Sequence, residues 1–156
     1  MTPAVLLLKK CKIPFELLQY HHDINSTSYG LEAVEKLSLP AEQVFKTLVI
    51  NTDTQQLVVA IVPVNTQLNL KAVAKSLNVK KASLADAKRV EATTGYILGG
   101  VSPLGQKKPL KTLIDNSAEK LNIMYVSGGK RGLEIALAPH DLKTITQAKF
   151  ATIASV

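Results

Sequence analysis

Two apolar runs rich in β-branched residues, at 45–51 and 57–62, constrain the fold of this chain most strongly. Such runs favour strands, because branched side chains pack well on a pleated surface. The five residues between the runs, 52–56, are polar and allow the chain to reverse its direction. We therefore expect a β-hairpin over residues 45–62.

Helices and further strands are predicted on both sides of this hairpin. Thr2 and Asn69 are expected as N-caps, and Ser83 and Asp86 as a capping pair. The apolar spacing predicts helices at 31–37 and 70–77. The caps and the prolines Pro3 and Pro139 predict further helices at 3–10, up to about 91, and at 139–145. Strands are expected at 15–20, 45–51, 57–62, 110–114, 123–126, 133–137 and 149–154.

These elements mix without strict strand–helix alternation, which favours the α+β class. With 156 residues, the chain is long enough for one domain that spans residues 1–156. We expect a mixed, mostly antiparallel sheet that curls into a barrel-like core with flanking helices.

The net charge of +7 indicates a nucleic-acid partner, with a basic surface that binds no polyanion as the alternative. Aromatic residues make up only 4% of the chain, which argues against a stacking platform for single strands. No apolar stretch approaches a membrane span, and the N-terminal run has the wrong charge order for a signal peptide. A cytoplasmic protein without membrane contact is therefore expected.

The possible metal ligands and thiols are few. The single cysteine, Cys11, excludes an internal disulfide and is expected to be buried as a small hydrophobic residue. His21 and His22 would point to opposite faces of a strand, so they form a poor chelating pair. No metal-binding motif is present, and we predict no metal site.

Two glycine-rich segments, residues 99–105 and 127–132, each lie beside an apolar run. Glycine lets a backbone approach a ligand where a Cβ would collide, and the amides of such loops bind negative charge. The first segment is not a nucleotide loop, because Gln106, Lys107 and Lys108 stand where Gly-Lys-Ser/Thr would be needed. Together with Lys46, the loops suggest a site for an anionic or ester-bearing ligand.

Lys46 is a cation in the first strand of the hairpin, in phase with Leu48 and Ile50. A cation among core residues is costly unless its head reaches water or a partner. Lys46 therefore either extends along apolar surface into solvent or holds a phosphate or carbonyl oxygen at the mouth of a cavity.

Other polar residues are open to two interpretations. Ser127 is either a turn residue or a ligand-positioning hydroxyl, and Tyr20 either packs or forms a pocket wall. Glu134 alternates with apolar strand residues, so an exposed strand face is its default position. His140 and Asp141 would complete a triad with Ser127 only by chance.

Three segments, residues 44–48, 94–105 and 126–135, strongly resemble the YbaK/EbsC family. Members of that family are free-standing relatives of the editing domain inserted in bacterial prolyl-tRNA synthetases. The branch that the chain resembles most is the Cys-tRNA(Pro) deacylases, over about residues 20–141. The resemblance implies a barrel-like mixed sheet, hydrolysis of a wrong amino acid from tRNA(Pro), and no metal or nucleotide cofactor.

The resemblance also implies roles for individual residues. Lys46 corresponds to the essential lysine of the family. On physical grounds, the backbone amides of Gly99, Gly100 and Val101 are expected to face the developing oxyanion. Tyr29 and Glu134 stand where relatives often carry Phe and Asp, which leaves the amino-acid specificity open. The implied substrate-binding residues are Tyr20, Tyr29, Thr47, Pro103, Ser127, Gly128, Gly129 and Glu134. Lys107, Lys108, Lys130 and Arg131 flank the glycine loops and are expected to contact tRNA phosphates.

Three functions follow from these observations. The first, which the resemblance implies, is hydrolysis of Cys-tRNA(Pro) by the route suggested for this family, in which the thiol of the substrate attacks the ester. The second is the same reaction on Ala-tRNA(Pro), in which water must attack. The third is a tRNA-binding module without catalytic power. The expected partners are the acceptor end of tRNA(Pro) and, in a transient complex, prolyl-tRNA synthetase.

Overall fold

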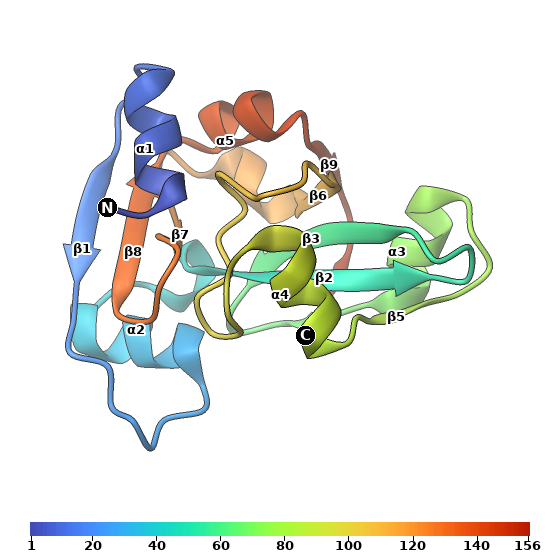
Figure 1. Ribbon diagram of the computed structural model, residues 1–156, viewed down its shortest axis with the longest axis horizontal. Helices are drawn as coiled ribbons and strands as arrows, with labels where there is room; N and C mark the ends of the chain where they lie inside the picture. The colour runs from blue at the N-terminus through green and yellow to red at the C-terminus, as the bar shows by residue number, and fades with distance from the viewer.

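The computed structural model describes residues 1–156, and the predicted hairpin lies at its centre (Figure 1). The hairpin strands β2 (Phe45–Thr52) and β3 (Leu57–Pro63) are antiparallel, with Lys46 opposite Val62. Three more strands complete a sheet in the order β5-β2-β3-β6-β9: β5 (Ala82–Leu84), β6 (Lys111–Asp115) and β9 (Lys149–Ala151). Because β6 pairs in parallel with both β3 and β9, the sheet is mixed, as expected.

The remaining strands form two smaller antiparallel sheets. One has the order β1-β8-β7 and contains β1 (Glu16–Gln19), β7 (Met124–Ser127) and β8 (Leu133–Leu137). The other pairs β4 (Gln67–Leu68) with β10 (Ala154–Ser155). A single isolated bridge between Val44 and Tyr125 links the β2 side to β7, so the strands do not form the continuous barrel-like sheet that was expected.

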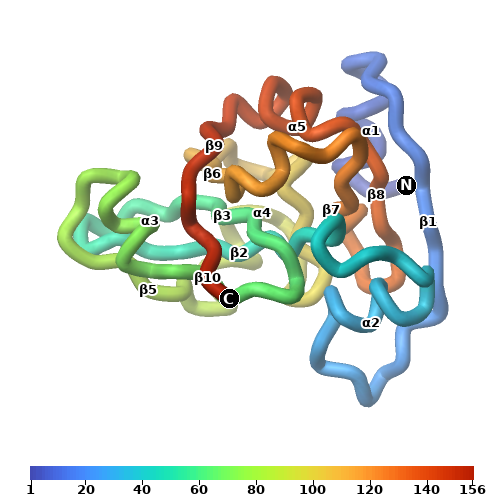
Figure 2. The backbone as a smooth tube through the Cα atoms, turned by 180° about the vertical axis from the view of Figure 1, so that it is seen from behind, coloured from blue at the N-terminus to red at the C-terminus, as the bar shows by residue number.

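Five α-helices accompany the sheets, and the bounds of most agree with the predictions. They are α1 (Pro3–Lys10), α2 (Tyr29–Leu37), α3 (Leu70–Leu77), α4 (Ala87–Thr94) and α5 (Pro139–Thr146), with 3-10 helices at Ala41–Gln43 and Asn116–Lys120. In both views α3 and β5 lie at one end of the molecule, and α1, α2 and β1 lie at the other (Figure 2). None of these helices combines the length and the apolar character that crossing a membrane requires.

The caps of the helices were predicted in part. Thr2 accepts a hydrogen bond from the amide of Val5, and Asn69 accepts one from the amide of Ala72, which confirms both N-caps. The capping pair of Ser83 and Asp86 is wrong, because Ser83 is taken into β5 opposite Asn51 and the Asp86 side chain makes no cap bond. The prediction for Cys11 is also wrong: it follows the last turn of α1 and is exposed.

The hairpin is buried on both faces, which explains the uninterrupted apolar run in β3. Val59 and Ile61 belong to the main core, between the two larger sheets and helices α1 and α5. Val58, Ala60 and Val62 point to the opposite face, into a second cluster with Val73 of α3. A strand covered on both faces needs apolar residues at every position rather than at alternate ones.

Asp115 at the end of β6 holds the C-terminal segment in place. Its buried carboxylate accepts hydrogen bonds from the amides of Ile153 and Ala154 at 3.1 and 3.0 Å. It also accepts one from the amide of Ser117, at the start of a 3-10 helix. These bonds draw the chain away from β6 after Ala151, so the expected strand at 149–154 is divided into β9 and β10.

We predict that Asp115→Ala lowers the free energy of unfolding by about 1–3 kcal/mol, because it leaves buried amide donors without an acceptor. Equilibrium urea denaturation measures this change. Glu119→Ala is the matched control, since Glu119 is an exposed acidic residue in the adjacent 3-10 helix. Its effect should stay within about 0.5 kcal/mol. Equal losses in the two variants would contradict the role given to Asp115.

Candidate functional site

A cavity of about 400 Å³ lies where the two larger sheets meet. Segments far apart in the sequence form its walls: the start of β2, the start of α2, the first glycine loop and the β7–β8 hairpin. Nine of the predicted site residues line it, namely Tyr20, Tyr29, Lys46, Thr47, Gly99, Val101, Ser127, Lys130 and Glu134. A volume of this size is typical of small-molecule sites.

The other predicted site residues are not among those that line the cavity. The side chains of Lys107 and Lys108 are exposed, and Pro103 is buried within the first glycine loop. Gly100 packs on the second glycine loop, where an added Cβ would lie 2.9 Å from the Cα of Lys130. Gly128 and Gly129 shape the β7–β8 turn, in which Gly129 has a φ of +108° that favours glycine.

The amides of the first glycine loop are not equivalent. The amide of Gly100 donates to the carbonyl of Ile97 at 2.9 Å and is therefore already used within the loop. The amides of Gly99 and Val101 have no acceptor within the protein, and both residues line the cavity. Of the three amides expected to face an oxyanion, these two are available for a ligand.

Lys46 has the strand orientation that was predicted, and it lines the cavity. Leu48 and Ile50 pack in the second cluster, on the same face of β2. The Lys46 ammonium donates one hydrogen bond, to the carbonyl of Thr66 at 2.8 Å, and burial lowers its pKa. An ammonium has three donors, so two of them remain for a ligand.

Glu134 is buried, and its predicted exposed position is wrong. It lies on β8 between Leu18 of β1 and Ser127 of β7, and its side chain lines the cavity. Burial raises its pKa to about 8, so the carboxyl is mostly neutral at pH 7. Glu32 is the acidic partner in both ion pairs of the structure. Lys46 and Glu134 therefore form no ion pair with each other.

Three hydroxyl groups complete the polar lining. The Thr47 hydroxyl is buried without a hydrogen-bond partner, which is unusual for a buried polar atom and suits a ligand-binding role. The Ser127 hydroxyl accepts from the amide of Gly129 at 3.2 Å, which leaves its own proton free to donate. Burial and the charges of Glu134 and Glu32 raise the pKa of Tyr20 to about 12, so its hydroxyl stays protonated.

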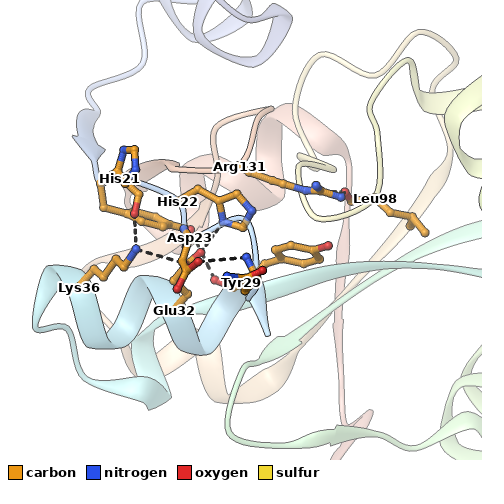
Figure 3. A network of polar contacts seen from close by, with 10 residues as sticks. His21, His22, Asp23, Tyr29, Glu32, Lys36, Leu98 and Arg131 are labelled. Carbon is orange, nitrogen blue, oxygen red and sulfur yellow. Dashed lines mark hydrogen bonds and ion pairs between the residues drawn. The ribbon is translucent and has the colours of Figure 1, made fainter. Parts of the chain in front are cut away.

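A polar network centred on the buried carboxylate of Glu32 lies at the start of α2 (Figure 3). The carboxylate of Glu32 bonds His22 Nδ1 at 2.6 Å, the amide of Asp23 at 2.8 Å and the ammonium of Lys36 at 3.2 Å. Burial by itself would raise the pKa of Glu32, but these bonds outweigh burial and lower the pKa to about 2. The i,i+4 spacing to Lys36 is a sequence signal for one partner of Glu32, whereas His22 and Asp23 reach the carboxylate only in the folded chain.

None of the three histidines lines the cavity. His22 belongs to the network around Glu32, and the backbone carbonyl of His21 accepts a bond from Lys36. His140 packs edge-on against Phe150 and does not line the cavity with Ser127. The structure contains no group of three or more histidine, cysteine or acidic side chains placed to share a metal ion.

Comparisons with known proteins agree on one family. The model of the aminoacyl-tRNA editing domain matches residues 26–145. A protein of Enterococcus faecalis that carries the name Cys-tRNA(Pro)/Cys-tRNA(Cys) deacylase EbsC is 37% identical over 153 residues, which cover 97% of this chain and 92% of that protein.

Solved structures share the fold at low sequence identity. One is described as a trans-editing enzyme for prolyl-tRNA synthetase, with a TM-score of 0.85 at 20% identity over 100% of this chain and 99% of that one. Another is a hypothetical protein, with a TM-score of 0.88 at 22% identity over 99% of this chain and 100% of that one. These two likenesses establish the α+β fold.

The buried carboxyl of Glu134 predicts a pH dependence of stability. Between its ordinary pKa of 4.5 and the value of about 8 in the folded protein, the folded state binds more protons than the unfolded state. Stability therefore falls as the pH rises through this range, by at most about 1.4 kcal/mol per pH unit from this group. Glu134→Gln removes this contribution, so the urea midpoint should change less between pH 5 and pH 8 than in the wild type.

Glu16→Gln serves as the control, since Glu16 is exposed on the neighbouring strand β1. It should keep the wild-type pH dependence. If Glu134→Gln also keeps it, the carboxyl does not retain its proton in the folded protein.

Proposed function

Since this chain belongs to the aminoacyl-tRNA editing domain family, we propose that it hydrolyses mischarged Cys-tRNA(Pro) in trans. The observation that carries the proposal is a cavity in which Lys46 and Glu134 lie unpaired beside the free amides of Gly99 and Val101. The name of the relative that is 37% identical supports the choice of a cysteinyl substrate.

Each group of the cavity suits one part of an aminoacyl ester. Lys46 and the amides of Gly99 and Val101 hold the carbonyl oxygen and stabilise the negative charge that it develops. The Glu134 carboxylate accepts a hydrogen bond from the α-ammonium group of the amino acid. The positive charge of that ammonium favours the ionised form of the carboxyl. The hydroxyls of Thr47 and Ser127 hydrogen-bond the terminal ribose or the amino acid.

The bound cysteine supplies the nucleophile. Its sulfur attacks the ester carbonyl carbon, the bond from that carbon to the ribose oxygen breaks, and the thiol proton ends on this oxygen. The products are free tRNA and a cyclic thioester of cysteine, which water opens to cysteine. Because an ester is already activated, the protein needs only to orient the groups and stabilise charge. Alanine has no thiol, so water must attack its ester and the reaction should be slower.

We also propose that tRNA phosphates bind the basic side chains around the cavity. Lys130 is exposed and lines the cavity, and Lys107 and Lys108 follow the first glycine loop with exposed side chains. Prolyl-tRNA synthetase would form a transient complex with this protein. Within that complex, a tRNA(Pro) released by the synthetase would present its acceptor end to this surface.

The proposed function is tested with a panel of charged tRNAs. Wild-type protein is incubated with Cys-tRNA(Pro), Ala-tRNA(Pro) and Pro-tRNA(Pro), with and without prolyl-tRNA synthetase, and the remaining ester is measured. We expect the cysteinyl ester to disappear fastest. Lys46→Ala should slow its loss by about 10²–10³-fold, because a preorganised charge at the carbonyl oxygen is removed.

Lys71→Ala is the control for a lost lysine, since Lys71 is exposed on α3 at the far end of the molecule (Figure 1). Faster loss of alanine would reverse the choice of substrate. Binding of tRNA without any deacylation would favour the non-catalytic module. Full activity of Lys46→Ala would refute the role of the lysine.

The phosphate contacts predict a dependence on salt. The logarithm of the tRNA affinity should fall linearly with the logarithm of the salt concentration, because each bound phosphate releases counterions. Replacing Lys107 and Lys108 together by alanine should reduce this slope by about 0.7–0.9 per lost contact, as measured by filter binding. An unchanged slope would place the phosphates elsewhere.

A further inference from the structure

Arg131 joins two walls of the cavity that are far apart in the sequence. Its Nε and Nη2 atoms donate to the carbonyl of Leu98 at 3.1 and 2.7 Å. Its guanidinium carbon lies 4.6 Å from the centre of the Tyr29 ring, a cation–π distance. Figure 3 shows this side chain reaching from the β7–β8 turn past Tyr29 to Leu98. We call Arg131, Tyr29, Leu98 and Gly99 the rim cluster.

Gly99 shows how closely the rim cluster is packed. An added Cβ at Gly99 would lie 2.7 Å from Arg131 Nε and 2.7 Å from Cε2 of Tyr29. Gly99 also has a φ of +85°, which favours glycine. The guanidinium and the aromatic ring thus occupy the space that a side chain at this position would need, next to an amide that is free for the substrate.

Within the rim cluster, the Tyr29 ring is held in place by His22 and Glu32. The ring of His22 lies 5.6 Å from that of Tyr29, and His22 is bonded to the buried carboxylate of Glu32. Glu32 and Tyr29 both belong to the first turn of α2. These contacts fix the position of the Tyr29 ring, and Arg131 links the first glycine loop to that ring.

We infer that Arg131 is a positioning residue that sets the width of the cavity and the place of the Gly99 amide. This inference rests on the proposed function, since it assigns the amide to the ester carbonyl. Without Arg131, the carbonyl of Leu98 loses both of its donors and the loop is free to move away from Tyr29. The cavity then widens, the oxyanion loses a donor, and larger aminoacyl groups enter.

The inference differs from the role in phosphate binding that was expected for Arg131. A phosphate contact would be felt in tRNA affinity and in its salt dependence. A positioning role is felt in the rate of ester cleavage and in the choice of amino acid, and it couples Arg131 energetically to Tyr29.

The test compares Arg131→Gln, Arg131→Lys, Tyr29→Leu and the double variant of Arg131→Gln with Tyr29→Leu. Arg131→Gln should lower kcat for Cys-tRNA(Pro) by about 10–100-fold with little change in KM, because a misplaced group costs rate rather than affinity. Hydrolysis of Pro-tRNA(Pro) should rise relative to that of Cys-tRNA(Pro). Arg131→Lys should retain part of the rate, since an ammonium can still lie over the ring.

Coupling provides the sharper criterion. If Arg131 acts through Tyr29, the double variant should lose little more rate than Arg131→Gln alone. Arg89→Gln is the matched control, because Arg89 also donates to a backbone carbonyl, that of Gln55 at 2.7 Å, but its bonds go to Asn51 and Gln55 rather than to the rim cluster. It should keep the wild-type kcat and selectivity.

Hydrogen exchange supplies a readout that does not depend on activity. In the absence of tRNA, Arg131→Gln should speed exchange of the Gly100 amide, which is bonded to the carbonyl of Ile97. It should also speed exchange of the Glu32 amide, which is bonded to the carbonyl of Ser28, whereas Arg89→Gln should change neither. Fully additive losses, or a change confined to KM and the salt slope, would overturn the inference in favour of a phosphate contact. An inactive wild-type protein would refute the proposed function. The hydrogen-exchange comparison would still decide whether Arg131 holds the first glycine loop in place.

Discussion

Burial of the β2–β3 hairpin on both faces is the constraint on which the site depends. Because side chains alternate along a strand, β2 must place Lys46 on the face shared with Leu48 and Ile50. The strand begins at the seam between the two larger sheets, where packing gives way to the cavity. The fold thus sets an ammonium among apolar residues with a single protein acceptor, the carbonyl of Thr66. Its remaining donors are available to a substrate.

The electrostatics of the cavity follow from the same geometry. Lys46 and Glu134 both line it and form no ion pair with each other, and burial shifts each pKa toward the neutral form. Charges of this kind are expensive in an empty site and become favourable when a ligand brings the complementary groups. An aminoacyl ester brings a partner for each charge, its carbonyl oxygen for Lys46 and its ammonium for Glu134. The contrast is Glu32, whose charge is fully matched by its neighbours and serves the structure.

Local rules predicted much of the fold. The caps at Thr2 and Asn69, the hairpin and the helix that begins at Pro139 depend on residues near in sequence, and the structure confirms them. The errors arose where distant segments intervene. β5 took up Ser83, and the side chain of Asp115 divided the last strand. Lys46 and the glycine loops were indicated as a ligand site by the sequence pattern itself. The family resemblance was needed to add Tyr29, Thr47 and Glu134, since spacing alone does not show that these residues meet.

The sequence by itself determined the strands, most helices, the face of Lys46 and the positions where glycine permits close approach. These properties follow from the alternation of side chains, from capping and from backbone freedom, all of which act over a few residues. Only the tertiary structure decided that Glu134 is buried, that the Gly100 amide is already bonded, and that Arg131 bridges Leu98 and Tyr29. Each of these depends on which remote segment packs against the residue, and no local pattern carries that information.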